Sequence, residues 1–340
     1  MMRIGKAVLL VILPAVILGT TRIPFADRGP LQVQNRFPLH LMFLTPRPIS
    51  ALPPSAGRLN ASLAVDYSSV YVDESGPQYR FLMDMEIAVV GLSFAYGLTS
   101  RAAIRLDMPL VNMSGGFLDG FLENYHDLLG VGNYGRENRP RDSFAYRVDK
   151  GGSAWIEGDA GGLRLADVTL SGQWLLFSSS GAAALHASLL TSLKLPAGEP
   201  RHGYGSGRLD AGLFLPAQYE SGPWSFFTMP GFIWHGDPDS RGADVAARSS
   251  ITLFIGAAYA YNDRWQWLAQ LNYFSSPVER TGIALLDDGA FELALGFRTA
   301  LNPNWQVEFV FSEDIFTRAA PDFTIHLGLL RSFNALGNKP

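Results

Sequence analysis

Histidine, serine and aspartate residues that could act in catalysis occur in segments where polar and apolar side chains alternate. His186 and Ser188 are two residues apart, so in a strand both side chains would point to the same face. A Ser/His hydrolase needs such a pair within hydrogen-bonding reach of a third group, for which Asp210 and His326 are candidates. Nothing in the sequence marks these residues as reactive, so we assign no catalytic residue.

Metal and cofactor chemistry has little support in the sequence. The chain has no cysteine, and its six histidines show neither H-x-x-x-H nor H-E-x-x-H spacing. The aspartates of 235–239 and 287–288 could hold Ca²⁺, although solvated loop charge is the simpler interpretation. Residues 130–135 match G-x-G-x-x-G, but a polar stretch follows where a dinucleotide site needs a helix. We therefore expect no metal and no cofactor.

Charged and histidine residues on the polar side of the alternating segments form the largest set of candidate functional residues. Both signs of charge are present, so these groups could pair with one another or line a water-filled path. The candidates for a polar lumen are Asp66, Asp84, Glu86, Arg105, Asp107, Asp167, His186, Lys194, Asp210, Glu292, Arg298, Glu308 and His326.

The elements that must position these residues are strands. Alternation of apolar and polar residues recurs from residue 58 onward; Leu63 and Val65, for example, alternate with Ser62 and Asp66. Such a pattern predicts half-buried strands, and about 9–11 residues suffice to cross a bilayer at a tilt. We expect about twelve strands: 59–71, 81–97, 102–110, 163–177, 184–195, 208–219, 224–234, 251–261, 265–274, 291–298, 305–312 and 323–333.

The connections between these segments alternate between tight turns and long loops. Short connections such as 99–100 and 302–304 are followed by long ones such as 196–207 and 313–322. Outer-membrane barrels have short periplasmic turns and long external loops, whereas a soluble sandwich has no reason to separate loop lengths by end. The pattern predicts a transmembrane, antiparallel, up-and-down β-barrel over residues 58–333, with both termini in the periplasm.

Aromatic residues and the overall composition favour the same fold. Aromatics lie beside nearly every short turn, as expected of a ring at the lipid headgroups. They are Tyr96, Phe177, Tyr219, Trp224, Tyr261, Trp265 and Trp305. Charged residues make up only 17%, against about 25% in soluble domains, while the mean hydropathy of +0.09 is far below that of a helical membrane protein. The net charge of −4 argues against nucleic-acid binding.

The longest predicted loop, residues 111–162, contains a helical pattern. Phe117, Phe121 and other apolar residues lie on one stripe of 117–129, and Asp119 lies among the polar residues that occupy the rest. Long loops are often functional, so Phe117, Asp119, Phe121 and His126 are loop candidates. The segment could cap the external opening, fold into the lumen, or pack as a helix on the rim.

The two ends of the chain lie outside the strand pattern. Residues 1–26 resemble a signal peptide, with a basic start and an apolar run of 7–19, although the cleavage site is weak. Residues 27–57 are rich in proline and could form a plug or an extra strand. The last strand ends in an aromatic residue, Phe333, and in this it resembles the C-terminal signal that the barrel-assembly machinery recognises. Residues 334–340 form a tail. We expect export to a Gram-negative outer membrane, with its lipid and that machinery as partners.

Several stretches resemble an uncharacterised family of proteobacterial outer-membrane proteins, domain of unknown function 3187. They are Gly29–Leu31 with Asn35–Pro38, Ser114–Asp119 leading to His126, Leu193–Gly198, and Ser312–Asp314 with Asp322–Leu327. The resemblance covers nearly the whole mature chain. It implies a β-barrel envelope protein and supplies no activity or catalytic residue.

Three functions remain open at this point. The charged lumen and long loops favour a passive pore or small-solute channel. His186, Ser188 and His326 leave a lipid-modifying barrel enzyme as an alternative. A non-conducting structural barrel is the third, and it would have a lumen filled by ion pairs.

Overall fold

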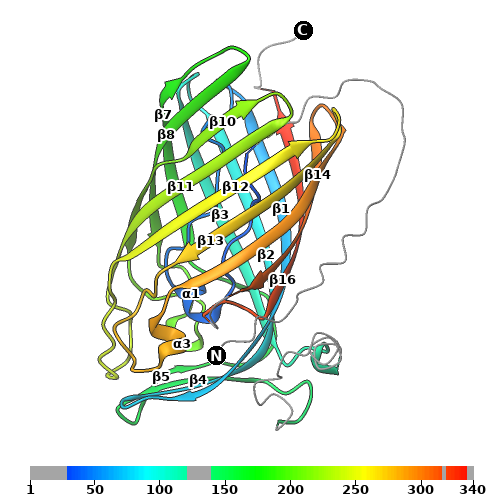
Figure 1. Cartoon of the computed structure of the whole chain (residues 1–340). Helices are drawn as coiled ribbons and strands as arrows, with labels where there is room; N and C mark the ends of the chain where they lie inside the picture. The colour runs from blue at the N-terminus through cyan, green and yellow to red at the C-terminus, as the bar shows by residue number, and fades with distance from the viewer. Residues whose placement is uncertain (1–28, 121–138, 316–318, 335–340) are drawn as a thin grey trace, which may run out of the picture.

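The computed structural model describes residues 29–120, 139–315 and 319–334. As the alternation predicted, the chain forms a closed antiparallel barrel of twelve strands (Figure 1). The barrel strands are β1 (Leu59–Ser75), β2 (Tyr79–Gly97), β3 (Ala102–Ser114), β7 (Val168–Ser178), β8 (Ala183–Leu195), β9 with β10 (Asp210–Phe214 and Ala217–Ser221), β11 (Trp224–His235), β12 (Ser250–Ala260), β13 (Trp265–Phe274), β14 (Ala290–Asn302), β15 (Trp305–Asp314) and β16 (Phe323–Phe333). β1 pairs with both β2 and β16, which closes the barrel.

Side-chain burial alternates along the barrel strands with a period of two residues. In β1, Leu63 and Val65 are 43% and 41% exposed, whereas Ala64 and Asp66 between and beside them are buried. The outer face is therefore apolar and the inner face polar, which is the reverse of a soluble protein and suits a barrel surrounded by lipid.

The two ends of the barrel differ, as the connection lengths predicted. At the short-turn end, aromatic side chains gather beside the tight turns: the ring of Trp224 lies 4.8 Å from that of Tyr259, and the Arg331 guanidinium lies 4.9 Å from the Trp305 ring. The opposite, long-loop end carries the extended connections (Figure 1). A ring of aromatics at one end is typical of the interface between lipid tails and headgroups.

One predicted strand, 208–219, is broken in two. β9 and β10 are separated by Leu215 and Pro216. Pro216 has no N–H to donate to the ladder, while its carbonyl still accepts a hydrogen bond from Ser188 N at 2.9 Å. The two pieces nevertheless occupy one position between β8 and β11.

The segment predicted as a long loop, 111–162, contains more structure than expected. β3 continues to Ser114, and a hairpin of β4 (Ala145–Lys150) and β5 (Ser153–Glu157) extends the sheet. β4 pairs with Tyr79–Asp84, the outer part of β2, beyond the point where β3 ends. β6 (Arg164–Leu165) is a short pairing on β3. The hairpin strands were missed because each is too short to show a clear alternation. Most of the predicted helix lies outside the described residues.

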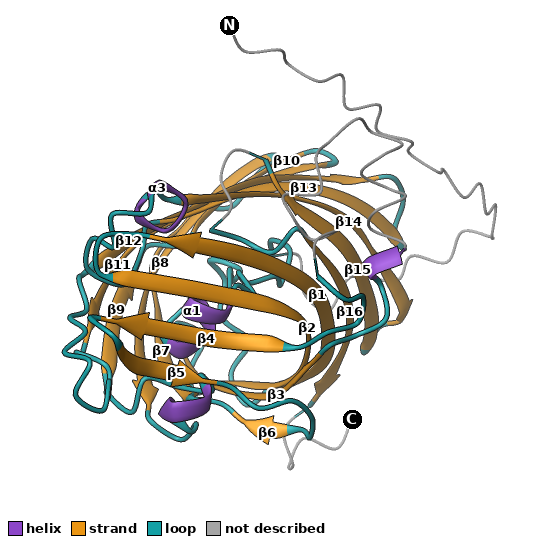
Figure 2. Ribbon diagram, turned by 90° about the horizontal axis from the view of Figure 1, so that it is seen from below, coloured by secondary structure: helices purple, strands orange, loops and turns teal. Residues whose placement is uncertain are grey.

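An apolar cluster covers the long-loop end. It joins the outer part of β2, through Phe81 and Met83, to Trp155 of β5 and to the short helix α1 (Pro38–Met42). Ile283, which precedes α3 (Ala284–Asp287), belongs to the same cluster. Figure 2, viewed onto this end, shows β4 and β5 lying across the barrel. Among the described residues, no helix has the length and apolar character needed to span a bilayer.

Candidate functional site in the barrel lumen

Residues 29–57, hereafter the strap, lie inside the barrel as an irregular segment with one short helix, α1 (Figure 1). The strap begins beside residues of β13, β14 and β15. Arg298 donates to the carbonyls of Gly29 and Pro30, both at 2.9 Å, and Leu31 N donates to Gln270 Oε1 at 3.2 Å. Its last residues lie against the short-turn end, where Gly57 N donates to the carbonyl of Gly97. The strap therefore runs in from that side, turns at α1 and returns.

The centre of the lumen holds a network of alternating charges, which we call the central network. Arg36 of the strap donates through Nε to Asp66 at 2.7 Å, and the other Asp66 oxygen pairs with His326 Nδ1. Glu308 pairs with Arg298, whose Nε lies 2.9 Å away, and lies 3.6 Å from His326 Nε2. All five side chains are buried. Buried charges are stable only when paired and hydrogen-bonded in this way.

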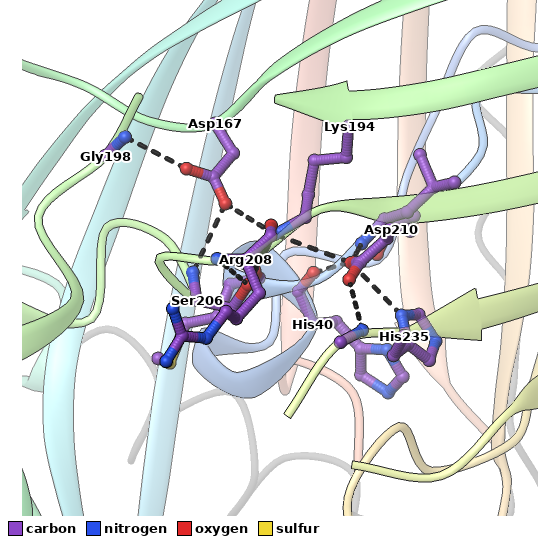
Figure 3. A network of polar contacts seen from close by, with 12 residues as sticks. His40, Asp167, Lys194, Gly198, Ser206, Arg208, Asp210 and His235 are labelled. Carbon is purple, nitrogen blue, oxygen red and sulfur yellow. Dashed lines mark hydrogen bonds and ion pairs between the residues drawn. The ribbon is translucent and has the colours of Figure 1, made fainter. Parts of the chain in front are cut away.

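A second network, the outer network, surrounds Lys194 near α1 (Figure 3). Lys194 Nζ lies 2.6 Å from Asp167, 3.4 Å from Asp210 and 2.9 Å from the carbonyl of Met42 in the strap. Asp210 also accepts from the backbone N–H of Leu44 at 2.7 Å. Wall residues thus bind the strap through its backbone as well as its side chains.

His40, in α1, lies beside the outer network and is neutral. Desolvation by burial, with a smaller contribution from His235, lowers its pKa to about 3. His235 in turn faces Asp210, with 3.1 Å between Nδ1 and the carboxylate, and lies 2.8 Å from Ser250 Oγ. The imidazole of His40 packs between the rings of Phe37 and Phe274. These apolar neighbours cannot solvate a charged imidazolium, so the neutral form is favoured.

The predicted residues at the outer end hold the beginning and end of the long connection. Glu86 accepts from the backbone N–H groups of Phe117 and Leu118 at 2.9 and 2.6 Å. Asp84 pairs with Arg139 at 2.5 Å, and Asp119 accepts from Asp142 N at 2.7 Å. Gly116 approaches Glu86 closely with a φ of +75°, and a Cβ there would overlap the carboxylate. Asp84 and Glu86 therefore anchor this connection.

Three further candidates, Glu292, Arg105 and Asp107, lie on the inner face. Glu292 is buried opposite Asn272, and Arg105 donates to Ser93 Oγ at 3.0 Å beside Asp107. Phe117 is 70% exposed and packs on Tyr67. Phe121 and His126 lie outside the described residues.

The structure does not bring the hydrolase candidates together. His186 hydrogen-bonds Ser178 at 2.9 Å, Ser188 accepts from Gln173 at 3.2 Å, and His326 pairs with Asp66 on the β1–β16 side of the barrel. A nucleophile and its base must be within about 2.6–3.2 Å of each other. This arrangement is that of polar side chains packed in a lumen.

The spaces between strap and wall are small. One cavity of about 50 Å³ lies against β3, β7 and β8, and a second of about 30 Å³ lies against β1, β15 and β16. Because a single water needs roughly 10–15 Å³ by this measure, each has room for only a few water-sized molecules. The strap must move for a larger solute to pass.

The strap residues that complete these networks were missed from the sequence. Arg36, Arg47 and His40 lie in the lumen, as does the wall residue His235, which faces Asp210. The available signal was the presence of two arginines in a proline-rich segment otherwise dominated by apolar residues, since arginine is buried only with partners.

A family model for "Protein of unknown function (DUF3187)" matches residues 8–333. The chain belongs to this family. A search of curated proteins gave no match. Among solved structures, the COG4313 outer membrane channel from Pseudomonas putida F1 is similar in fold, with a TM-score of 0.55 and 14% identity over 83% of this chain and 98% of that one. The NanC porin follows with a TM-score of 0.44 and 10% identity, covering 80% of this chain and 98% of its own.

Proposed function

We propose that this barrel is an outer-membrane channel for small solutes and that the strap closes it in the structure described above. The supporting observation is that the wall is polar and charged from the central network to the outer network, while a single tethered segment fills the space. If the strap withdrew, the remaining wall would hydrate readily and form a polar path. The solved channel with the same fold is consistent with this proposal.

The strap is held by both polar and apolar contacts, since Leu39 and Met42 of α1 belong to the apolar cluster at the long-loop end. Both ends of the strap face the short-turn end, so it can withdraw there once α1 leaves that cluster. Its hydrogen bonds to the wall, such as that between Ser50 Oγ and Gln218 at 3.0 Å, can be exchanged for bonds to water.

Locking the strap tests this proposal, and the absence of cysteine makes it practical. In planar bilayers, Ser50→Cys/Gln218→Cys protein joined by a short reversible thiol crosslinker should lose its conductance steps, and a reductant should restore them. Each single-cysteine variant treated identically is the control. Arg36→Gln, which removes one of the two charged partners of Asp66, should lengthen the open periods. Unchanged conductance after crosslinking would show that the strap is not the closing element.

A non-conducting structural barrel is the second candidate, and the ion-paired lumen favours it. It predicts no conductance steps from the wild type, from Arg36→Gln or from the reduced double-cysteine protein. The same bilayer recordings therefore separate the two functions.

We further propose that residues 1–26 direct export, that outer-membrane lipid surrounds the apolar face, and that the barrel-assembly machinery recognises the last strand. The alternating apolar strand that ends at Phe333 supports the last point.

A further inference from the structure

Arg47 differs from the other buried cations of the lumen because its guanidinium is not hydrogen-bonded to any described residue. The side chain is buried, with 8% of the residue exposed, and its Nε has no partner. Its one ion pair is with Asp107, whose Oδ1 lies 3.9 Å from Nη1. That separation is too long for a hydrogen bond, and Asp107 Oδ1 is likewise buried without a hydrogen-bond partner.

The position of Arg47 is fixed by its surroundings. Pro46 and Pro48 flank it in the returning half of the strap and restrict the backbone on both sides. Its guanidinium lies against Gly91 of β2, where an added Cβ would come within 3.2 Å of Nη2. A glycine in the middle of a strand is unfavourable in itself, and here it leaves room for the arginine to lie close to the wall.

Arg47 also joins the two lumen cavities. The cavity of about 50 Å³ and that of about 30 Å³ lie on different sides of β2, and both are lined by this side chain. Any small solute that passed between strap and wall on this side would meet the guanidinium.

The local charge balance is positive. Asp107 lies 3.9 Å from Nη1 of both Arg47 and Arg105, so one carboxylate faces two guanidinium groups. Arg105 also donates to Ser93, whereas the planar fork of Arg47 keeps all its donors available. Such a fork matches the two oxygens of a carboxylate or the oxygens of a small inorganic anion.

We infer that Arg47 is an anion-binding residue that holds a small inorganic anion or a carboxylate between strap and wall while the strap is in place. Anion binding at Arg47 does not require conduction, so it stands or falls independently of the proposed function. A cation such as K⁺ gains no partner from the same site, because Asp107 is shared by the two arginines.

Chloride NMR tests this binding. The full-length protein in detergent should broaden the ³⁵Cl resonance, and sodium acetate should reverse the excess width by competition. Arg47→Gln should abolish the excess width, whereas Arg147→Gln, which removes an exposed arginine of β4, should retain it. Equal broadening by wild type and Arg47→Gln would overturn the anion site even if the barrel conducts. Broadening that depends on Arg47 in a barrel without conductance would retain the site and overturn the channel.

Discussion

At the scale of single residues, most buried charges of the lumen, unlike Arg47, are stabilised by several polar partners. Lys194 has three donor hydrogens and lies within 2.9 Å of three acceptors, on Asp167, Ser206 and the carbonyl of Met42. The cost of removing an ammonium from water is large unless it is offset in this way. His40 avoids this desolvation cost in a different way, because it remains uncharged.

Because His40 is neutral in the folded protein, we predict that the free energy of unfolding decreases as the pH is lowered. Its pKa is about 3 in the folded protein and about 6.5 when unfolded, so the unfolded chain binds the additional proton as the pH drops. The free energy of unfolding should therefore be intact above about pH 6.5. It should fall toward pH 3 by up to about 1.4 kcal/mol per pH unit from this residue.

Denaturant unfolding in detergent, compared at several pH values for wild type and His40→Phe, measures this contribution. The variant keeps a planar ring between Phe37 and Phe274 and should lose less stability below pH 6.5. Parallel pH profiles for the two proteins would contradict a neutral His40. Comparing the two proteins removes the part of the pH dependence that they share.

At the scale of elements, the barrel strands and the strap follow different rules. The strands were predictable because one face meets lipid and the other the lumen, so each repeats a two-residue pattern. Trp265–Phe274 and Phe323–Phe333 were predicted with the boundaries that the structure has. The strap has no such repeat, because Leu31, Arg36 and Arg47 each meet a different environment.

The candidate site was predictable only in part, for the same reason. Positions such as Asp66 and Glu308 follow from the alternation, which places them on the inner face. The partners of these residues cannot be predicted from the alternation. Arg36 contacts Asp66 because of the path that the strap takes, and His326 contacts it because β16 pairs with β1. The β4–β5 hairpin was missed because pairing with β2, rather than local preference, makes these short segments strands.

The hairpin predicts a large effect of one core substitution. Trp155 of β5 is 1% exposed in the apolar cluster over the long-loop end. Trp155→Ala should lower the free energy of unfolding by about 3–5 kcal/mol, through lost burial and the cavity left behind. Denaturant unfolding in detergent measures it. Phe117→Ala, at a side chain that is 70% exposed, should change stability by less than about 0.5 kcal/mol. Similar effects of the two would argue against a packed cover.

At the scale of the whole molecule, the apolar outer face predicts how the free-energy cost of an introduced arginine varies with its depth in the bilayer. Ile255 lies midway along β12 and Leu301 lies beside a short turn, and both point outward with about half their surface exposed. An arginine near the bilayer midplane costs about 2–4 kcal/mol and one near the interface about 0–1 kcal/mol.

Folding into lipid vesicles, followed by tryptophan fluorescence, should therefore be weakened far more by Ile255→Arg than by Leu301→Arg. Each substitution introduces the same side chain on the same face, so each serves as the control for the other. Equal costs at the two positions would show that the barrel does not span a bilayer along the axis inferred here.

The contact of Arg36 with Asp66 has a consequence for assembly. Asp66 belongs to the first barrel strand and His326 to the last, and they lie opposite each other where the two ends of the sheet meet. A slip of one residue at that junction would turn every side chain of a strand to the other face and leave Arg36 buried without its anion. The strap, which precedes the first strand in the chain, can therefore make its ion pair with Asp66 only in a barrel that has closed in the correct alignment.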